Sequence, residues 1–247
     1  MCGRPMPEDA LLRLDGVHTH IGRYHILHGV DLTVREGRLT MLLGRNGAGK
    51  TTTLRTIMGL WRAGAGAIRF TGADITARPT PDIARLGIAY VPESMGIFGH
   101  LTVRENLLLA AGPAGFDAAR LDAVFALFPV LRAKFQQAAG TLSGGQKQMV
   151  AISRAIIEER RLIIVDEPTK GLAPAVIGQL IEAFQALKRA RTTILMVEQN
   201  FHMARALGDE VAVMDDGRIV HTGPMAALAA DEALQARLLG LSLASHQ

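Results

Sequence analysis

Hydrophobic residues recur along this chain with two different spacings, and the spacing changes several times. Residues 10–43 alternate apolar and polar side chains before the apolar run LTMLLG. This pattern is typical of antiparallel strands that lead into a buried strand. Beyond that run, helical and strand patterns follow one another in turn. The alternation predicts a mostly parallel sheet with helices on its faces.

The elements predicted after residue 43 are short and well separated. Helices are expected at KTTTLRTIMGL (50–60), TPDIARLG (80–87) and APAVIGQLIEAFQALKRA (173–190). Strands are expected at AIRFTG (67–72), IAYV (88–91), LIIVDEP (162–168) and TTILMVEQ (192–199). The segment EVAVMDDGRIVHTG, residues 210–223, is typical of a hairpin that turns at Asp216 and Gly217.

Strand patterns stop between residues 94 and 160. Helical patterns take their place, at TVRENLLLAAG (102–112), DAARLDAVFALFPVLRAKF (117–135) and GGQKQMVAISRAIIEER (144–160). The length of the chain suits one large domain. We therefore expect a single domain over 1–247, with a core formed by 1–93 and 161–247 and a helical region inserted at about 94–160.

Composition narrows the class of protein. Lys and Arg total 27 against 23 Asp and Glu, and they are scattered apart from a short cluster at 188–191, so no nucleic-acid-binding face is expected. Cys2 is the only cysteine, which excludes an internal disulfide and favours a reducing compartment. No apolar stretch precedes Cys2, and none is long enough for a signal core or a membrane span. A soluble chain without a lipid anchor is expected, docked to a membrane only through other proteins.

Four histidines lie close together in the sequence, at positions 18, 20, 25 and 28. Because side chains alternate along a strand, His18 and His20 are expected on one face. A metal site is one interpretation of this cluster. No cysteine or further clustered ligand supports it, so an exposed histidine-rich hairpin is the favoured interpretation.

The segment GRNGAGKT, residues 44–51, follows a predicted strand and opens a predicted helix, which is the context of a phosphate-binding loop. Its glycines let backbone N–H groups turn toward phosphate oxygens, and the helix N-terminus adds a favourable dipole. Lys50 is expected to bridge the β- and γ-phosphates, Thr51 to ligate Mg²⁺ and Thr52 to reach the α-phosphate. The predicted nucleotide-binding residues of this loop are Gly44, Arg45, Asn46, Gly47, Ala48, Gly49, Lys50, Thr51 and Thr52.

Two adjacent carboxylates end the strand LIIVDEP. Asp166 and Glu167 stand at its C-terminal end, where α/β sheets bind ligands. Burying both without a cation would be costly. Asp166 suits a Mg²⁺ shell and Glu167 suits polarising an attacking water, because phosphoryl transfer mainly needs positioning and charge neutralisation. The competing interpretation is that both residues cap the next helix.

A second anion site is predicted at TLSGGQKQ, residues 141–148. Ser143, followed by Gly144 and Gly145 at a helix start, offers free N–H groups and a hydroxyl. One nucleotide does not need two separate phosphate-binding helix ends from one chain. The two sites are therefore expected to meet across two subunits.

The phosphate loop, LSGGQ and VDEP, in this order and spacing, resemble the ATP-binding subunits of ABC transporters over essentially the whole chain. The resemblance implies a P-loop NTPase core with a RecA-like, mostly parallel sheet, an N-terminal antiparallel β subdomain and an inserted helical subdomain. It also implies ATP and Mg²⁺ as cofactors and a head-to-tail dimer whose closure on ATP drives membrane partners. The residues that would act on the partner's ATP are Ser143, Gly144, Gly145 and Gln146.

Three further stretches, at 90–107, 166–174 and 197–200, resemble the second ATPase subunit of branched-chain amino-acid importers. Residues 94–96, Ser-Met-Gly, depart from the Gly-Arg-Arg type of run in that subgroup. The resemblance implies uptake of branched-chain amino acids or related small polar solutes at the cytoplasmic face of the inner membrane. It implies a second, different ATPase subunit, two membrane permease subunits and, indirectly, an extracytoplasmic solute-binding protein, with no nucleic acid. Residues 95–103 would line the groove for a permease helix, or would simply pack the helical region.

Three positions depart from ABC ATPases at large. Glu93 stands where a glutamine normally contacts Mg²⁺ and the γ-phosphate; a carboxylate keeps an oxygen for the metal but adds negative charge, so Mg²⁺ dependence should increase. Gln199 stands where a histidine normally contacts the γ-phosphate; an amide donates a hydrogen bond but never becomes cationic. Ile21 stands where an aromatic ring usually stacks on the base, and Tyr24 is the alternative platform. Asn200 is expected to cap the helix that follows.

The hypothesis from the sequence is an ATP-hydrolysing subunit of an importer. Water would attack the γ-phosphate in line, with Glu167 as base, Thr51 and Asp166 holding Mg²⁺, Lys50 neutralising charge and Gln199 contacting the γ-phosphate. The alternative is a soluble ABC-type ATPase that acts on nucleic acid or the ribosome. Such proteins usually fuse two cassettes or insert a long coiled coil, and this chain shows neither. A regulatory ATP sensor with little hydrolysis is a third interpretation, raised by the two departures at the γ-phosphate.

Overall fold

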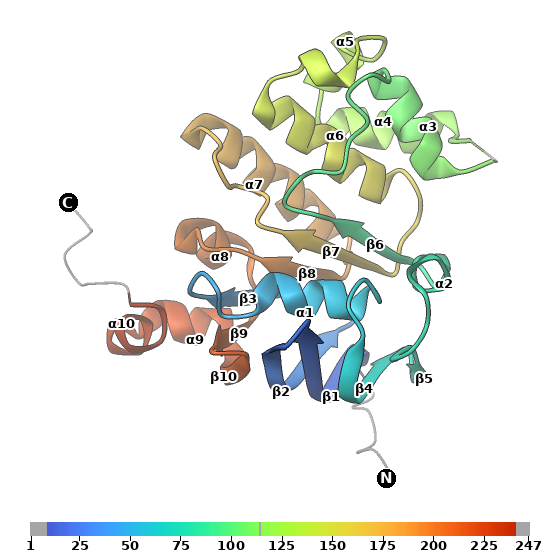
Figure 1. The fold of residues 1–247 in the computed structure, drawn as a ribbon. Helices are drawn as coiled ribbons and strands as arrows, with labels where there is room; N and C mark the ends of the chain where they lie inside the picture. The colour runs from blue at the N-terminus through green and yellow to red at the C-terminus, as the bar shows by residue number, and fades with distance from the viewer. Residues whose placement is uncertain (1–8, 114, 241–247) are drawn as a thin grey trace.

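Two sheets hold the strands in the part of the chain that the structure describes. A computed structural model describes residues 9–113 and 115–240. The four-stranded sheet has the order β2-β1-β4-β5, and the six-stranded sheet has the order β10-β9-β3-β8-β7-β6 (Figure 1). The strands are β1 (Ala10–Ile21), β2 (Tyr24–Arg35), β3 (Leu39–Gly44), β4 (Ala63–Phe70), β5 (Ala73–Asp74), β6 (Ile88–Val91), β7 (Leu162–Asp166), β8 (Ile194–Val197), β9 (Glu210–Asp215) and β10 (Arg218–Pro224). The helices are α1 (Lys50–Ile57), α2 (Thr80–Arg85), α3 (Val103–Ala111), α4 (Ala118–Leu127), α5 (Val130–Ala133), the 3₁₀ turn η1 (Ala139–Thr141), α6 (Gly144–Ile156), α7 (Pro174–Arg189), α8 (Phe201–Leu207), α9 (Met225–Ala230) and α10 (Glu232–Leu239).

The four-stranded sheet is antiparallel and carries the predicted N-terminal strands. Strand β1 pairs with β2 on one side and with β4 on the other. The alternation of residues 10–43 therefore predicted these strands correctly. Strand β4 begins at residue 63, earlier than predicted, and it belongs to this antiparallel sheet. One face of the sheet covers α1, where the hydroxyl groups of Thr19 and Thr56 lie 3.1 Å apart.

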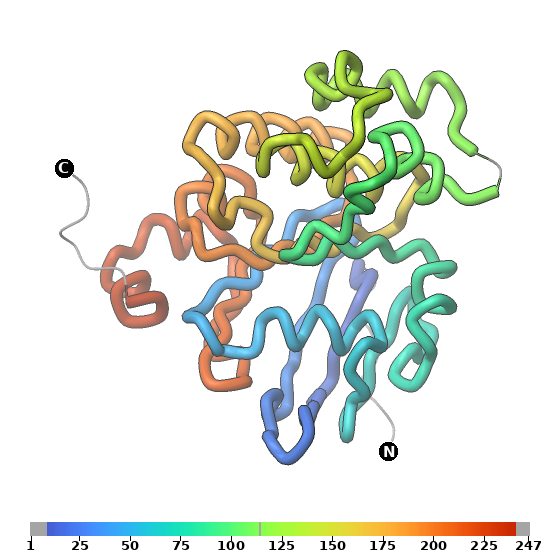
Figure 2. Tube along the Cα trace, turned by 45° about the horizontal axis from the view of Figure 1, so that its top comes forward, coloured from blue at the N-terminus to red at the C-terminus, as the bar shows by residue number. Residues whose placement is uncertain are grey.

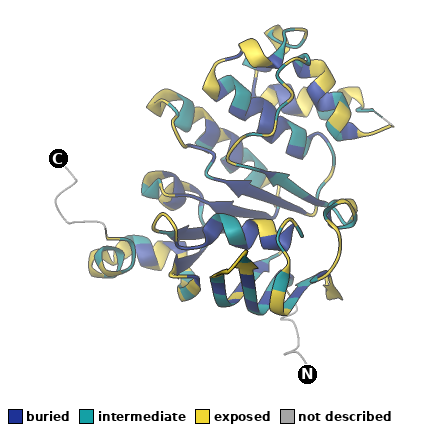
Figure 3. Ribbon diagram, in the orientation of Figure 1, coloured by how far each residue is buried: buried dark blue, intermediate teal, exposed yellow. Residues whose placement is uncertain are grey.

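The six-stranded sheet is mostly parallel, as the alternating patterns predicted. Strands β9, β3, β8, β7 and β6 run parallel, and β10 adds an antiparallel edge through the predicted hairpin at Asp216 and Gly217. Both turn residues have positive φ, 40° and 71°, which matches a two-residue turn of the kind that hairpins favour. Strands β7 and β8 are buried along their whole length (Figure 3).

Each face of the six-stranded sheet packs against its own hydrophobic core. Along β3, Met41 and Leu43 join the core that includes α6, α7 and α8, whereas Leu42 joins the core that includes α1 and the antiparallel sheet. Alternate strand residues point to opposite faces, which explains this division. Figure 2 shows the consequence: the helices from residue 103 to 156 gather at one end, away from the hairpin of β1 and β2.

The described residues between β6 and β7 form helices and no strand, apart from an isolated bridge between Thr102 and Ala138. The helical pattern at 117–135 is divided between α4 and α5. Phe128 leaves the helical region of φ and ψ because Pro129 follows it. The boundaries at 94 and 160 stay a prediction, since α6 shares its core with the sheet. No helix in the described ranges is long and apolar enough to cross a bilayer.

Candidate functional site

The loop between β3 and α1 has a backbone that only glycine adopts easily. Gly44, Gly47 and Gly49 have φ values of 147°, 82° and 105°. A methyl group on Gly44 would lie 2.1 Å from the carbonyl oxygen of Met214 on β9. The loop also rests on the β9–β10 turn, where the Gly217 N–H donates to the Ala48 carbonyl at 2.9 Å. The predicted strand–loop–helix context of residues 44–51 is therefore present.

Lys50 is the first residue of α1, and its ammonium lies against this loop. Its Nζ donates to the carbonyl oxygens of Gly44 and Arg45, at 2.8 and 3.0 Å. It also lies 4.0 Å from the Glu167 carboxylate. Burial lowers the pKa of Lys50, and the charges of Glu167 and Asp166 offset part of that shift. A cation is thus held between the loop and the carboxylates.

Asp166, the last residue of β7, is fully buried and accepts two hydrogen bonds. Thr51 Oγ1 donates at 3.0 Å and the Tyr90 hydroxyl at 3.2 Å. Burial raises the pKa of Asp166, and these bonds offset part of the rise. Burial, with the charge of Asp166 as the next cause, raises the pKa of Tyr90 to about 12. The structure therefore brings together Thr51 and Asp166, the predicted Mg²⁺ ligands, whereas the contact with Tyr90 was not predicted.

This donor set fits Mg²⁺. A hydroxyl and a carboxylate are oxygen donors, and Mg²⁺ is usually bound by one or two carboxylates together with substrate phosphates. Within the described ranges no group of three or more His, Cys, Asp or Glu side chains can hold a metal by itself. The four clustered histidines are therefore not such a group. The rings of His20 and His25 stack, with their centroids 4.1 Å apart and an angle of 9° between the ring planes.

Glu167 lies beside Gln199, because β7 and β8 are neighbours. The Gln199 side-chain amide donates to Glu167 Oε1 at 2.6 Å, and the Glu167 N–H donates to the Val197 carbonyl at 2.9 Å. Glu167 has a positive φ of 47°, a conformation that is uncommon outside glycine. The structure thus joins two residues that were predicted separately for the γ-phosphate end.

Neither carboxylate at the end of β7 caps a helix. The next helix, α7, begins at Pro174 after Ala173 and has no side-chain cap. The capping interpretation of Asp166 and Glu167 is therefore wrong. Asn200 does cap α8, as predicted: its side chain accepts a hydrogen bond from the Met203 N–H at 3.1 Å.

Glu93 lies two residues after β6 and pairs with a residue that was not predicted as part of the site. Lys170 Nζ lies 2.6 Å from Glu93 Oε1 and 3.7 Å from Glu167 Oε2. The hydrogen bond and the charge of Glu93, followed by the charge of Glu167, raise the pKa of Lys170. Two of the predicted side chains, Glu93 and Glu167, therefore belong to one charged cluster with Lys170.

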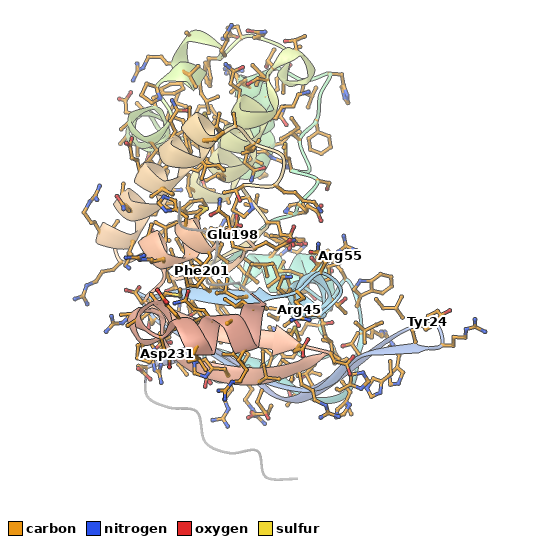
Figure 4. The ribbon with its side chains drawn as sticks, turned by 90° about the vertical axis from the view of Figure 1, so that its left-hand side faces the viewer. Tyr24, Arg45, Arg55, Glu198, Phe201 and Asp231 are labelled. Atoms are coloured by element: carbon orange, nitrogen blue, oxygen red, sulfur yellow. The ribbon has the colours of Figure 1, made fainter. Side chains whose placement is uncertain are left out.

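Glu198 is a further residue that sequence reasoning missed. It is buried and accepts four hydrogen bonds, two from the N–H and hydroxyl of Thr169 and one each from the Gln199 and Asn200 N–H groups. Burial raises the pKa of Glu198, and the hydrogen bonds offset part of the rise. Figure 4 shows it inside the molecule, between the loop residue Arg45 and the helical end. An acid placed directly after the buried strand β8 was the signal for it.

Replacing Glu198 by glutamine is expected to lower the free energy of unfolding by about 2–4 kcal/mol. Glutamine has one acceptor oxygen and an NH₂ group, so two of the four donors would face another donor. Urea unfolding of the full chain measures the change. Glu182→Gln on the exposed face of α7 is the control, expected within about 0.5 kcal/mol of the unaltered chain. Equal unfolding of the two variants would contradict the anchoring role of Glu198.

The two candidates for the base platform lie opposite each other. Ile21 and Tyr24 are partners across the end of the β1–β2 hairpin. Tyr24 is 60% exposed, and the guanidinium of Arg23 lies 5.2 Å from its ring centroid. Figure 4 shows Tyr24 far out on this hairpin. Gly217 links the hairpin to the phosphate loop. Its carbonyl accepts from the His28 N–H at 2.9 Å, and its N–H donates to the Ala48 carbonyl of the loop. Which side chain contacts the base stays a prediction.

The LSGGQ segment lies away from the chain's own phosphate loop. Ser143 and Gln146 form a reciprocal capping box at the start of α6. Helix α6 packs in the core on one face of the six-stranded sheet, and α1 packs on the other. The two predicted anion sites are therefore not brought together within one chain.

The cavity that reaches the phosphate loop is small. The cavity beside Gly44, Arg45, Glu198 and Gln199 has a volume of only about 160 Å³. A cavity of about 1040 Å³ lies elsewhere, between the two sheets, and contains none of the predicted site residues.

Comparison with known proteins agrees with this fold. The family model for ABC transporters matches residues 27–170. The chain is 40% identical to the high-affinity branched-chain amino acid transport ATP-binding protein BraG of Pseudomonas aeruginosa, over 93% of this chain and 100% of that protein. It is 34% identical to the probable branched-chain amino acid transport ATP-binding protein LivF of Archaeoglobus fulgidus, over 94% and 99%.

Solved structures show the same architecture. A nucleotide-free ATP-binding cassette from an ABC transporter superposes with a TM-score of 0.79 at 25% identity, over 94% of this chain and 99% of that one. An ATP-binding subunit of an ABC transporter superposes with a TM-score of 0.77 at 31% identity, over 94% and 96%. The chain belongs to the ABC transporter family and is one of its ATP-binding cassette ATPases.

Proposed function

We propose that this chain is the ATP-hydrolysing subunit of an importer for branched-chain amino acids or related small polar solutes. The observation that carries the ATPase part is that, at the C-terminal end of β7, Lys50 lies 4.0 Å from Glu167 and Thr51 donates to Asp166. The solute class is supported by two relatives named for branched-chain amino acid transport, each matched over almost its full length.

ATP would bind with its phosphates on the loop of residues 44–49 and the N-terminus of α1. Lys50 would turn its ammonium from the loop carbonyls to the β- and γ-phosphates. Thr51 and Asp166 would hold Mg²⁺, with Glu93 as a further oxygen donor. The metal, when bound, neutralises charge on the phosphates.

Glu167 is proposed as the base that takes the proton of the attacking water. The Gln199 amide donates to Glu167 Oε1, and Oε2, which lies 3.7 Å from Lys170 Nζ, would take the proton of the water. Gln199 would also donate to the γ-phosphate, without the positive charge that a histidine can supply. The side chains at the ends of β7 and β8 therefore act as one unit at the γ-phosphate.

A second ATPase subunit would complete the site. Residues 143–146 cannot serve the phosphate loop of the same chain, since α1 and α6 pack on opposite sheet faces. In a head-to-tail dimer they would cover the ATP held by the partner. The small volume of the cavity at the phosphate loop, about 160 Å³, supports this arrangement, because one chain alone encloses little of a nucleotide.

Two permease subunits are the proposed membrane partners, with a solute-binding protein acting on them from outside. A cavity of about 430 Å³ lies between the sheet and the helical region, lined by Leu60, Tyr90, Met95 and Arg154 among others. Met95 belongs to the predicted docking segment 95–103. Its side chain also packs partly against the helical core, so the docking and packing interpretations are compatible.

The test is purification of the tagged full chain from membranes of the source cells, with identification of co-purifying proteins and measurement of ATP turnover. Two permease subunits and a second ATPase are expected. Leu60→Glu should prevent co-purification of the permeases, because Leu60 is 50% exposed and lines the cavity of about 430 Å³. The matched control is Leu109→Glu, because Leu109 is 58% exposed and does not line this cavity. Recovery of nucleic acid or ribosomes in low salt, with no membrane protein, would contradict the proposal.

A further inference from the structure

Lys170 stands between two carboxylates that come from different strands. It lies on the segment after β7, and Glu93 lies on the segment after β6, the parallel neighbour of β7 (Figure 1). The ammonium is 2.6 Å from Glu93 and 3.7 Å from Glu167. A single cation therefore links the two chain segments that border the γ-phosphate end of the site.

The backbone that carries Lys170 is held in place by hydrogen bonds. Thr169 is buried, and both its N–H and its hydroxyl donate to Glu198. The Lys170 N–H donates to the Glu167 carbonyl at 3.2 Å, and the Leu172 N–H donates to the Thr169 carbonyl at 3.1 Å. Although the Lys170 side chain is 59% exposed, the backbone next to it is held by hydrogen bonds to the buried Glu198 side chain.

A carboxylate at position 93 creates an electrostatic problem for a triphosphate site. Glu93, Asp166 and Glu167 are negative, and so are the phosphates that would lie beside them. Lys50 is directed to the phosphate loop, where it donates to Gly44 and Arg45. The cation in contact with Glu93 is Lys170. Like charges at close range cost free energy unless an opposite charge lies between them.

We propose that Lys170 is a positioning residue for the γ-phosphate end of the site. It holds the Glu93 carboxylate next to Glu167 and supplies the opposite charge that lets a carboxylate, rather than an amide, stand beside a triphosphate. This inference rests on the proposed function, because it takes Glu93 and Glu167 to face the γ-phosphate. The proposal predicts that the Lys170 side chain strengthens the binding of nucleoside triphosphates more than that of diphosphates.

The experiment measures binding of two nucleotides to the full chain by calorimetry: the non-hydrolysable ATP analogue AMP-PNP and ADP, each with Mg²⁺. Lys170→Met, which removes the charge but keeps the length, is expected to weaken AMP-PNP binding about tenfold and ADP binding less than about twofold. Lys170→Gln should behave in the same way. Lys170→Arg keeps the charge and should restore binding to within about threefold.

A Glu93→Gln background makes the test specific. Without the Glu93 charge, Lys170→Met should change AMP-PNP binding by less than about threefold. An equal loss in both backgrounds, an equal loss for ADP and AMP-PNP, or failure of Lys170→Arg to restore binding would overturn the inference. Unchanged AMP-PNP binding by Lys170→Met would overturn it too. Failure of the unaltered chain to bind AMP-PNP would instead contradict the proposed function.

Discussion

Replacing Glu167 by glutamine is expected to lower ATP turnover by about 10²- to 10⁴-fold, the contribution of a positioned general base, while ATP binding is retained. Glutamine keeps the shape of the side chain, and its oxygen still accepts the hydrogen bond from Gln199. Its amide cannot take a proton from water at neutral pH. Turnover is measured in the membrane complex, and binding is measured with Mg-ATP on the same preparation.

The matched control is Glu182→Gln on α7, which is exposed and outside the site. It should leave turnover unchanged. Normal turnover by Glu167→Gln would remove Glu167 from the role of base. Loss of ATP binding by that variant would show that Glu167 acts on the nucleotide itself rather than on the water.

Replacing Lys50 by alanine is expected to weaken Mg-ATP binding about 10- to 100-fold, because a charge-assisted hydrogen bond contributes about 1.5–3 kcal/mol. The fold should not be weakened in parallel. Burial lowers the pKa of Lys50, so the charged form is held at a cost in free energy. Calorimetry of Mg-ATP binding and thermal unfolding of the full chain measure the two effects.

Lys134→Ala in the helical region is the control for Lys50→Ala, since within the described residues the Lys134 side chain makes no hydrogen bond or ion pair, and it lies outside the loop. It should bind Mg-ATP as the unaltered chain does. Binding by Lys50→Ala within about twofold of that control would contradict the assignment of Lys50 to the phosphates, since it falls below even one charge-assisted hydrogen bond.

The parts of the fold that depend on local patterns were predictable. The strands of residues 10–43, the hairpin at Asp216 and Gly217 and the buried strand β7 each have a strong local pattern. The helical pattern at 117–135 does not show where one helix ends, because its apolar spacing continues through Pro129, although proline interrupts the backbone there. The sheet that β4 joins depends on non-local pairing, which the residues of β4 do not encode by themselves.

The site residues likewise fall into two groups, those in contiguous motifs and those whose contacts join different strands. The phosphate loop and the carboxylates after β7 are contiguous motifs, and their chemistry follows from residue type and context. The contacts of Glu198 with Thr169 and of Lys170 with Glu93 are different. They require β6, β7 and β8 to be neighbours, whereas long stretches of chain separate these strands in sequence. Such contacts follow only from the order of strands in the sheet.

The turn at Gly217 sets the spacing between the phosphate loop and the β1–β2 hairpin. One glycine binds the phosphate loop through its N–H and the β1–β2 hairpin through its carbonyl. A side chain there would clash with the Ile26 carbonyl, since a methyl group would lie 2.2 Å away. The hairpin and the phosphate loop are thus set at one spacing by the scaffold. If a nucleotide rests its base on that hairpin, we expect this fixed spacing to favour one distance between base and phosphates, whichever side chain forms the platform.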